Sequence, residues 1–172
     1  MTNSTDPLTL VLVGPMAAGK TSVGRRVARR LRVPFIDTDK RIVAAHGPIP
    51  AIFAEQGEGA FRELERLAVA DALAEGGVVS LGGGAVTDAG TRDLLRAHRV
   101  VFLTVSADAV ADRIRGSSRP LLESEDPLDR WRAIFDERRP WYEEVASTTF
   151  DTSRRPMQKI ADEIATWRKE QR

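Results

Sequence analysis

Short apolar runs alternate with longer stretches of helical periodicity along this chain. The run from Leu8 to Val13 is six residues long and ends at Gly14, which predicts a buried parallel strand. Further strands are predicted at residues 33–36, 78–81, 100–105 and 148–151. Helices are predicted from near residue 20 to 31 and at 58–75, 88–98, 107–115, 129–139 and from 156. This alternation predicts an α/β fold, in which a parallel sheet is covered by helices on both faces.

The first predicted helix has one apolar and one strongly basic face. Val23, Val27 and Leu31 are spaced by four residues, so they share a face, and the five arginines between Arg25 and Arg32 fall outside it. An amphipathic helix with a solvated basic face is therefore favoured over a nucleic-acid-binding patch.

Two other apolar sets are predicted to be buried. In the 58–75 helix the residues expected on one side are Phe61, Leu64, Leu67 and Ala68. The conspicuous aromatic residues expected in the core or covering it, rather than as ligand platforms, are Phe53, Trp131, Phe135, Trp141 and Trp167.

Composition narrows the possible functions. With 172 residues the chain has the length of one domain, here residues 1–172, and its net charge of +1 indicates no polyanionic partner, so no nucleic acid is expected. The chain has no cysteine, which excludes disulfides and thiolate chemistry, and its two histidines are too far apart in sequence to suggest a metal site. The apolar run at residues 8–13 is too short for a signal sequence or a membrane span, so a cytoplasmic protein without a membrane partner is expected.

A complete phosphate-binding loop follows the first predicted strand. Gly14-Pro15-Met16-Ala17-Ala18-Gly19-Lys20-Thr21 matches the pattern G-x-x-x-x-G-K-[ST], and Ser22 continues into the predicted helix. Glycines let successive N–H groups point at phosphate oxygens, and the helix adds its positive N-terminal end. Lys20 is expected to reach the β- and γ-phosphates of ATP, and the Thr21 hydroxyl to ligate Mg²⁺. Ala17 stands where many such loops carry glycine; because alanine is small, the loop is expected to form if this residue has a negative φ.

Two carboxylates, Asp37 and Asp39, come at the end of the second predicted strand. Open α/β sheets bind ligands at that edge, where a carboxylate can hold Mg²⁺ through water or accept a hydrogen bond from a substrate hydroxyl. The alternative is that these side chains cap the following helix, which is expected to begin near Lys40. The adjacent phosphate loop favours the functional interpretation.

Six motifs together resemble the shikimate kinase family. They are the phosphate loop, Asp37-Thr-Asp39, Phe61-Arg62-x-x-Glu65, Leu81-Gly-Gly-Gly84-Ala-Val, Arg119-Pro-Leu-Leu122 and Arg138-x-Pro-x-Tyr142. The resemblance extends from Leu8 to about Trp167. It implies a three-layer α/β/α kinase fold with a five-stranded parallel sheet, a substrate-binding segment at about 38–65 and a lid at about 113–125. It also implies transfer of the ATP γ-phosphoryl to the 3-hydroxyl of shikimate, on the pathway to chorismate and the aromatic amino acids, with one Mg²⁺ per subunit and a chain that is typically a monomer.

The resemblance also assigns residues to the acceptor. Arg62 and Arg138 match the residues that bind the shikimate carboxylate, and bidentate guanidinium groups suit that role. Asp39 matches the residue that holds the ring hydroxyls and is a candidate to deprotonate the attacking one. Glu65 can pair with Arg62 one helical turn away. The substrate ring is expected to lie against the backbone of Gly82, Gly83 and Gly84.

On the nucleotide side the resemblance implies catalytic roles for Lys20 and for Arg119, which would move onto the phosphates from the lid. Asp37 matches the carboxylate that meets Mg²⁺ through water, and its role gains weight because Ser80 stands where many phosphate-loop enzymes have a second metal-binding aspartate. The residues expected around adenine are Arg113, Arg155 and Pro156.

Three other functions remain open on the sequence. A related kinase could act on gluconate or a cyclitol, although Arg62 with Arg138 favours a carboxylate-bearing acceptor and the triple glycine favours the shikimate type. A nucleoside monophosphate kinase would share the architecture, but the six motifs do not suit it. A nucleotide-binding module without chemistry would be expected to have lost some of the charged residues named above.

Overall fold

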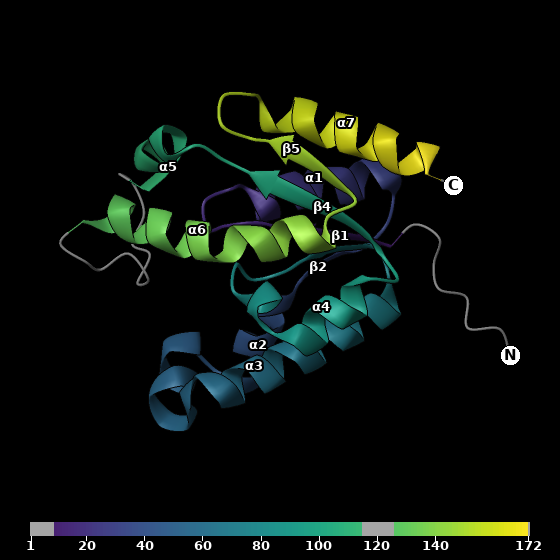
Figure 1. Ribbon diagram of the computed structural model, residues 1–172. Coiled ribbons are helices and arrows are strands. Elements are labelled where there is room, and N and C mark those ends of the chain that lie inside the picture. The colour runs from purple at the N-terminus through teal and green to yellow at the C-terminus, as the bar shows by residue number, and fades with distance from the viewer. Residues whose placement is uncertain (1–8, 115–125, 172) are drawn as a thin grey trace, which may run out of the picture.

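A five-stranded sheet, parallel throughout, forms the centre of the molecule (Figure 1). The computed structural model describes residues 9–114 and 126–171. The strands lie in the order β2-β3-β1-β4-β5. Their bounds are β1 Leu10–Val13, β2 Phe35–Asp37, β3 Val78–Ser80, β4 Arg99–Thr104 and β5 Thr148–Asp151. All five predicted strands are confirmed, and every pairing between neighbours is parallel.

Helices cover both faces of this sheet, which confirms the predicted three-layer α/β/α architecture. Their bounds are α1 Lys20–Leu31, α2 Thr38–His46, α3 Ile49–Glu75, α4 Ala89–Leu95, α5 Ala107–Ile114, α6 Pro127–Val145 and α7 Met157–Glu170, with a short 3₁₀ helix, η1, at Ala85–Thr87. Figure 1 shows α1 and α7 together on one side of the sheet and α6 on the other, with α2 and α3 forming a pair below it. Among the helices in residues 9–114 and 126–171, none is both long enough and apolar enough to cross a lipid bilayer.

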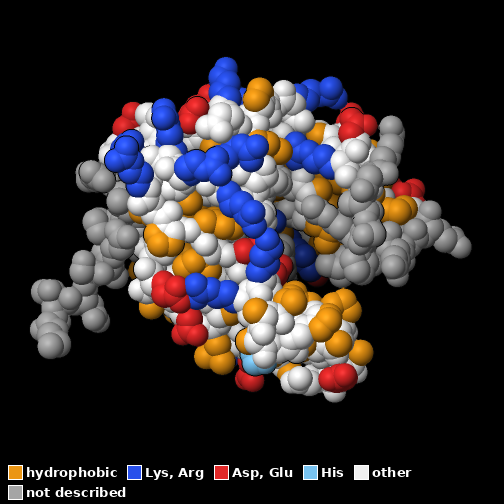
Figure 2. All heavy atoms as spheres, turned by 180° about the vertical axis from the view of Figure 1, so that it is seen from behind, with side chains coloured by type: hydrophobic (Ala, Val, Ile, Leu, Met, Phe, Trp, Pro, Cys, Tyr) orange, Lys and Arg blue, Asp and Glu red, His pale blue; other side chains and the backbone are white. Residues whose placement is uncertain are grey.

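The core forms where the pattern predicted it. All four residues of β1 are almost completely inaccessible to solvent, as expected for a central parallel strand. On α1, Val23, Val27 and Leu31 are buried. The arginines of α1 lie outside that apolar face, and three of them line a surface hollow of about 360 Å³ together with Arg32 and Gln158. Figure 2 shows that Lys and Arg side chains gather on one face of the molecule.

Two helices are longer than predicted. Helix α3 begins at Ile49 rather than at residue 58, and it bends at Gly57, whose φ of 85° is left-handed. Its predicted apolar side was partly wrong, since Leu67 is 62% exposed. Helix α6 was expected to end at Arg139 but continues through Pro140 to Val145. Proline removes only one helical hydrogen bond, and burial of Tyr142 beyond it against Phe102 offsets that loss.

Candidate active site

The phosphate loop joins β1 to α1, as predicted. Gly14 and Gly19 both adopt positive φ angles, 149° and 90°. A Cβ at Gly14 would collide with the main-chain carbonyl oxygen of Leu103 in β4, so the loop can pass this strand only as glycine. The Lys20 ammonium group donates to the carbonyl oxygens of Gly14, at 2.7 Å, and Pro15, at 2.9 Å. The cation therefore lies over the first turn of the loop, next to the space that phosphates occupy in loops of this type.

The loop forms although Ala17 does not have the negative φ that was set as the condition for it. Its φ is 68°, in the left-handed region, which costs a residue with a Cβ about 1–2 kcal/mol. Neighbouring side chains hold this part of the loop in place. Arg113 donates to the Ala17 carbonyl oxygen at 2.6 Å, and the buried Thr152 hydroxyl donates to the Ala18 carbonyl oxygen at 2.7 Å. These two hydrogen bonds offset the strain that the alanine introduces.

Asp37 caps the following helix, which was one of the two alternatives, and its carboxylate also contacts the phosphate loop. One oxygen of its carboxylate accepts from the Lys40 backbone N–H at 3.2 Å, which makes Asp37 the N-cap of α2. The other lies 3.3 Å from the Thr21 hydroxyl, which donates to it. A hydroxyl and a carboxylate side by side next to the phosphate loop are hard oxygen donors of the kind that Mg²⁺ prefers. Within the described parts of the chain no cluster of three or more His, Asp or Glu side chains could hold a metal, so phosphate oxygens and water would complete the coordination.

The glycine run after β3 is the point where the acceptor residues converge. A Cβ at Gly82 would lie 2.5 Å from an Asp39 carboxylate oxygen, and a Cβ at Gly84 would lie 2.5 Å from an Arg62 guanidinium nitrogen. Between them, a Cβ at Gly83 would lie 3.6 Å from an Arg138 nitrogen. The absence of side chains here thus lets one carboxylate and two guanidinium groups approach the same stretch of backbone.

The same run touches the phosphate loop. A Cβ at Gly83 would lie 3.6 Å from both the Gly14 carbonyl oxygen and the Met16 backbone nitrogen. The loop that follows β1 and the loop that follows β3 therefore meet, because their strands are neighbours in the sheet. The geometry brings the phosphate-binding loop into contact with a stretch of backbone that one carboxylate and two guanidinium groups approach.

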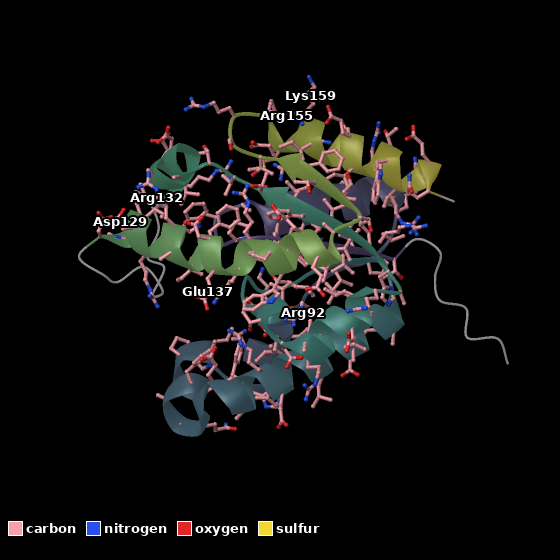
Figure 3. The ribbon with its side chains drawn as sticks, viewed as in Figure 1. Arg92, Asp129, Arg132, Glu137, Arg155 and Lys159 are labelled. Atoms are coloured by element: carbon pink, nitrogen blue, oxygen red, sulfur yellow. The ribbon has the colours of Figure 1, made fainter. Side chains whose placement is uncertain are left out.

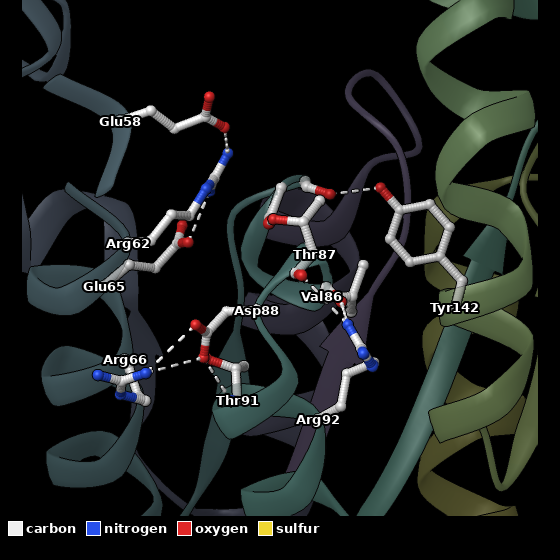
Figure 4. Close-up of polar contacts among 12 residues, drawn as sticks. Glu58, Arg62, Glu65, Arg66, Val86, Thr87, Asp88, Thr91, Arg92 and Tyr142 are labelled. Atoms are coloured by element: carbon white, nitrogen blue, oxygen red, sulfur yellow. Dashed lines mark hydrogen bonds and ion pairs between the residues drawn. The ribbon is translucent and has the colours of Figure 1, made fainter. Parts of the chain in front are cut away.

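Arg62 is held by two carboxylates, as Figure 4 shows. It donates to Glu65 at 2.7 Å and to Glu58 at 3.5 Å. The Glu65 side chain is only 2% exposed. Burial raises the pKa of Glu65 to about 7, although the charge of Arg62 opposes this shift. The surface ion pair that the sequence left as an alternative for these residues is therefore wrong: this is a buried pair that fixes the rotamer of Arg62.

Asp39 has an environment suited to accepting a proton. Burial, together with the negative charge of Asp37, raises the pKa of Asp39, while the charges of Lys20 and Arg62 lower it. A carboxylate whose pKa is raised is a stronger base than an exposed one. Its position beside Gly82, between the phosphate loop and Arg62, fits contact with a substrate hydroxyl.

The three residues expected around adenine, Arg113, Arg155 and Pro156, each make separate contacts in the structure. Both terminal nitrogens of Arg113 are engaged by main-chain carbonyls, those of Ala17 and Thr152, and burial lowers its pKa. Pro156 is the N-cap of α7. Arg155 forms an ion pair with Glu163 on α7, and Figure 3 shows it at the outer surface near the start of that helix. Arg119 and residues 115–125 of the expected lid lie outside the described residues.

Helix α6 contributes two hydrogen bonds that the sequence did not predict. The Trp131 indole donates to the Met16 carbonyl oxygen of the phosphate loop at 2.8 Å. The Tyr142 hydroxyl donates to the Gly83 carbonyl oxygen at 2.5 Å. Tyr142 was part of a recognised motif, but nothing in the pattern indicated its partner, and Trp131 was predicted only as core. Thr152 likewise carried no signal, because its contacts are to residues distant in the sequence.

Comparison with known proteins agrees with this geometry. The family model "Shikimate kinase" matches residues 16–169. Shikimate kinases from Corynebacterium efficiens and Streptomyces avermitilis are 46% and 45% identical, each over 90% of this chain and over 93% and 92% of their own length. The structure of a shikimate kinase from Acinetobacter baumannii in complex with shikimate superposes with a TM-score of 0.87 at 35% identity, covering 95% of this chain and 93% of that one.

A gluconokinase from Sinorhizobium meliloti shares the fold at a lower TM-score of 0.66 and 24% identity, which supports the architecture alone. The family match over residues 16–169 and the identity to relatives over 90% of this chain favour a shikimate kinase over a gluconate kinase. They show that this chain belongs to the shikimate kinase family, and the meeting of the phosphate loop with Asp39, Arg62 and Arg138 at one glycine run agrees with that.

Proposed function

We propose that this protein transfers the γ-phosphoryl group of ATP to the 3-hydroxyl of shikimate, giving shikimate 3-phosphate and ADP. The observation that carries the proposal is the meeting of the phosphate loop with Asp39, Arg62 and Arg138 around Gly82–Gly84. An acceptor held there by its carboxylate would present its hydroxyls towards the loop. Membership of the family supports the choice of shikimate over gluconate or a nucleotide.

The proposed mechanism depends on alignment and charge neutralisation. Arg62 and Arg138 would hold the shikimate carboxylate, and Glu65 keeps Arg62 oriented. Asp39 would accept the hydrogen bond, and then the proton, of the attacking hydroxyl. The backbone N–H groups of the phosphate loop and Lys20 would hold the phosphates in line with that hydroxyl.

Mg²⁺ fits the pair of oxygen donors formed by Thr21 and Asp37. We propose that Thr21 would hold the ion directly and Asp37 through water, and that the ion would supply positive charge next to the phosphates. Arg119, which lies outside the described residues, is proposed to add positive charge to the transferring group. Arg113, Arg155 and Pro156 are proposed to border the adenine.

A cytoplasmic monomer is the proposed form of the enzyme. Its support is that within the described residues few large apolar side chains are exposed, namely Val43, Phe53 and Leu67, at 43%, 36% and 62% exposure. A sedimentation measurement that gives a dimer mass would overturn this proposal.

ADP release from ATP and Mg²⁺, with and without shikimate, tests the proposed function. Strong dependence on shikimate is expected, and Asp39→Asn protein serves as a folded control with little turnover. ADP release at the same rate with and without shikimate, or no ADP release, would refute the assignment. Hydroxy acids, cyclitols and nucleotides would then be tested as acceptors.

A further inference from the structure

Helix α6 presents one face to the site along its length. Trp131, Phe135, Arg138 and Tyr142 are spaced by four, three and four residues, which places them in one stripe on the helix. Trp131, Phe135 and Tyr142 are buried, at 4%, 7% and 1% exposure. The stripe is therefore fixed in the core, and its one charged member is Arg138.

One end of the stripe is hydrogen-bonded to the phosphate loop, and the other end is hydrogen-bonded to the glycine run after β3. Near the start of the helix, the Trp131 indole donates to Met16 in the phosphate loop. Eleven residues later, a rise of about 16 Å, the Tyr142 hydroxyl donates to Gly83 in the glycine run (Figure 4). One rigid element thus contacts the nucleotide-binding and acceptor-binding backbones at separate points.

Tyr142 also contacts Arg138. Arg138 lies one helical turn before Tyr142 and interacts with the phenol, while the hydroxyl donates to Gly83; a Cβ at Gly83 would in turn lie 3.6 Å from an Arg138 nitrogen. Burial raises the pKa of Tyr142 to about 12, with Arg138 opposing the shift, so the hydroxyl keeps its proton in the working range of the enzyme. The Arg138 guanidinium and the Gly83 carbonyl are therefore both neighbours of a single buried hydroxyl.

Aromatic packing prevents this hydroxyl from moving. The Tyr142 ring stacks on Phe102 of β4 with centroids 5.2 Å apart, and the Trp131 ring stacks on Phe135 at the same distance. Because β4 is a central, buried strand, the position of the phenol is tied to the sheet itself. Loss of the hydroxyl would leave the ring in place and remove the polar group that lies next to Arg138 and Gly83.

We propose that Tyr142 is a positioning residue for the acceptor, which sets the direction of the Arg138 guanidinium and of the Gly83 backbone, while Trp131 positions the phosphate loop independently. This inference rests on the proposed function, because it requires a carboxylate-bearing acceptor at Arg138. Under this proposal, two residues of one helix affect different substrates: Tyr142 affects the acceptor and Trp131 affects ATP.

The test compares three variants by steady-state kinetics with each substrate varied in turn. Tyr142→Phe should raise the shikimate KM roughly tenfold, as expected for loss of one hydrogen bond to a charged group, and change the ATP KM by less than about twofold. Trp131→Phe should raise the ATP KM and leave the shikimate KM nearly unchanged. Trp141→Phe makes the same substitution at a partly exposed tryptophan of α6 and should change neither constant.

A second comparison distinguishes positioning from general loss of stability. In an Arg138→Lys background, Tyr142→Phe should raise the shikimate KM much less than it does in the unchanged protein, because the forked group it orients is gone. Thermal unfolding measured on every variant reports the stability change separately.

Equal changes in both KM values for Tyr142→Phe, a lower Tm with unchanged kinetics, or a full effect in the Arg138→Lys background would overturn the inference. A protein that shows no shikimate-dependent turnover before any substitution would instead refute the proposed function, and the inference with it.

Discussion

Replacing Glu65 with glutamine should change how stability depends on pH. The Glu65 side chain is 2% exposed and lies 2.7 Å from Arg62. Its pKa of about 7 in the folded protein compares with an ordinary value of 4.5. Glutamine has the same shape and can accept the same hydrogen bond, but it does not titrate. The comparison therefore measures how protonation of Glu65 contributes to the free energy of unfolding.

The sign follows from which state holds the proton more tightly. Because the folded-state pKa is raised, the folded protein keeps the proton between about pH 4.5 and about pH 7 while the unfolded chain releases it. The Glu65 contribution to stability is therefore greatest below the unfolded pKa and is lost as the pH rises through about 7. At about 1.4 kcal/mol per unit, the loss between about pH 5 and about pH 8 amounts to about 2–3 kcal/mol.

Urea unfolding of both proteins across this range measures the effect. The free energy of unfolding of Glu65→Gln minus that of the unchanged protein should increase by about 2–3 kcal/mol from about pH 5 to about pH 8 and level off above that. A constant offset between the two proteins over the whole range would show that Glu65 titrates normally and would refute the reasoning. A difference that decreases with pH would mean that Arg62 outweighs burial.

Three further predictions concern the site. Asp39→Asn should lower kcat roughly a hundredfold or more with little change in ATP affinity, and a collapse of ATP affinity with kcat unchanged would show that Asp39 is misassigned. Arg62→Ala should raise the shikimate KM roughly tenfold to a hundredfold, whereas an unchanged KM would remove Arg62 from the site. Ala17→Gly should raise the free energy of unfolding by up to about 1 kcal/mol, since it relieves a left-handed alanine, while Ala18→Gly should lower it. Equal losses in urea unfolding would contradict this.

The strands, the phosphate loop and the layer architecture could be predicted from the amino-acid pattern alone. These features depend on local patterns: continuous apolar runs for β1 and β4, glycines at loop positions, and spacing by four residues on α1. Recognition of six motifs in order then indicated the acceptor residues, although no single motif apart from the phosphate loop is specific.

Helix ends and backbone strain required the tertiary structure. The periodicity stops at Pro140, yet α6 continues because Tyr142 beyond it is buried against β4. Ala17 adopts a positive φ because Arg113, 96 residues away in the chain, and Thr152 secure the loop around it. Neither partner can be identified from local sequence.

The chemistry of the site was also decided by three-dimensional packing. The spacing of Arg62 and Glu65 predicted that they could pair, but only burial of that pair raises the pKa of Glu65. The glycine run predicted close approach, and only the fold places Asp39, Arg62 and Arg138 as the groups that approach. The sequence identifies the candidate residues, but the loss of solvent around them and their contacts with distant segments exist only once the chain is folded.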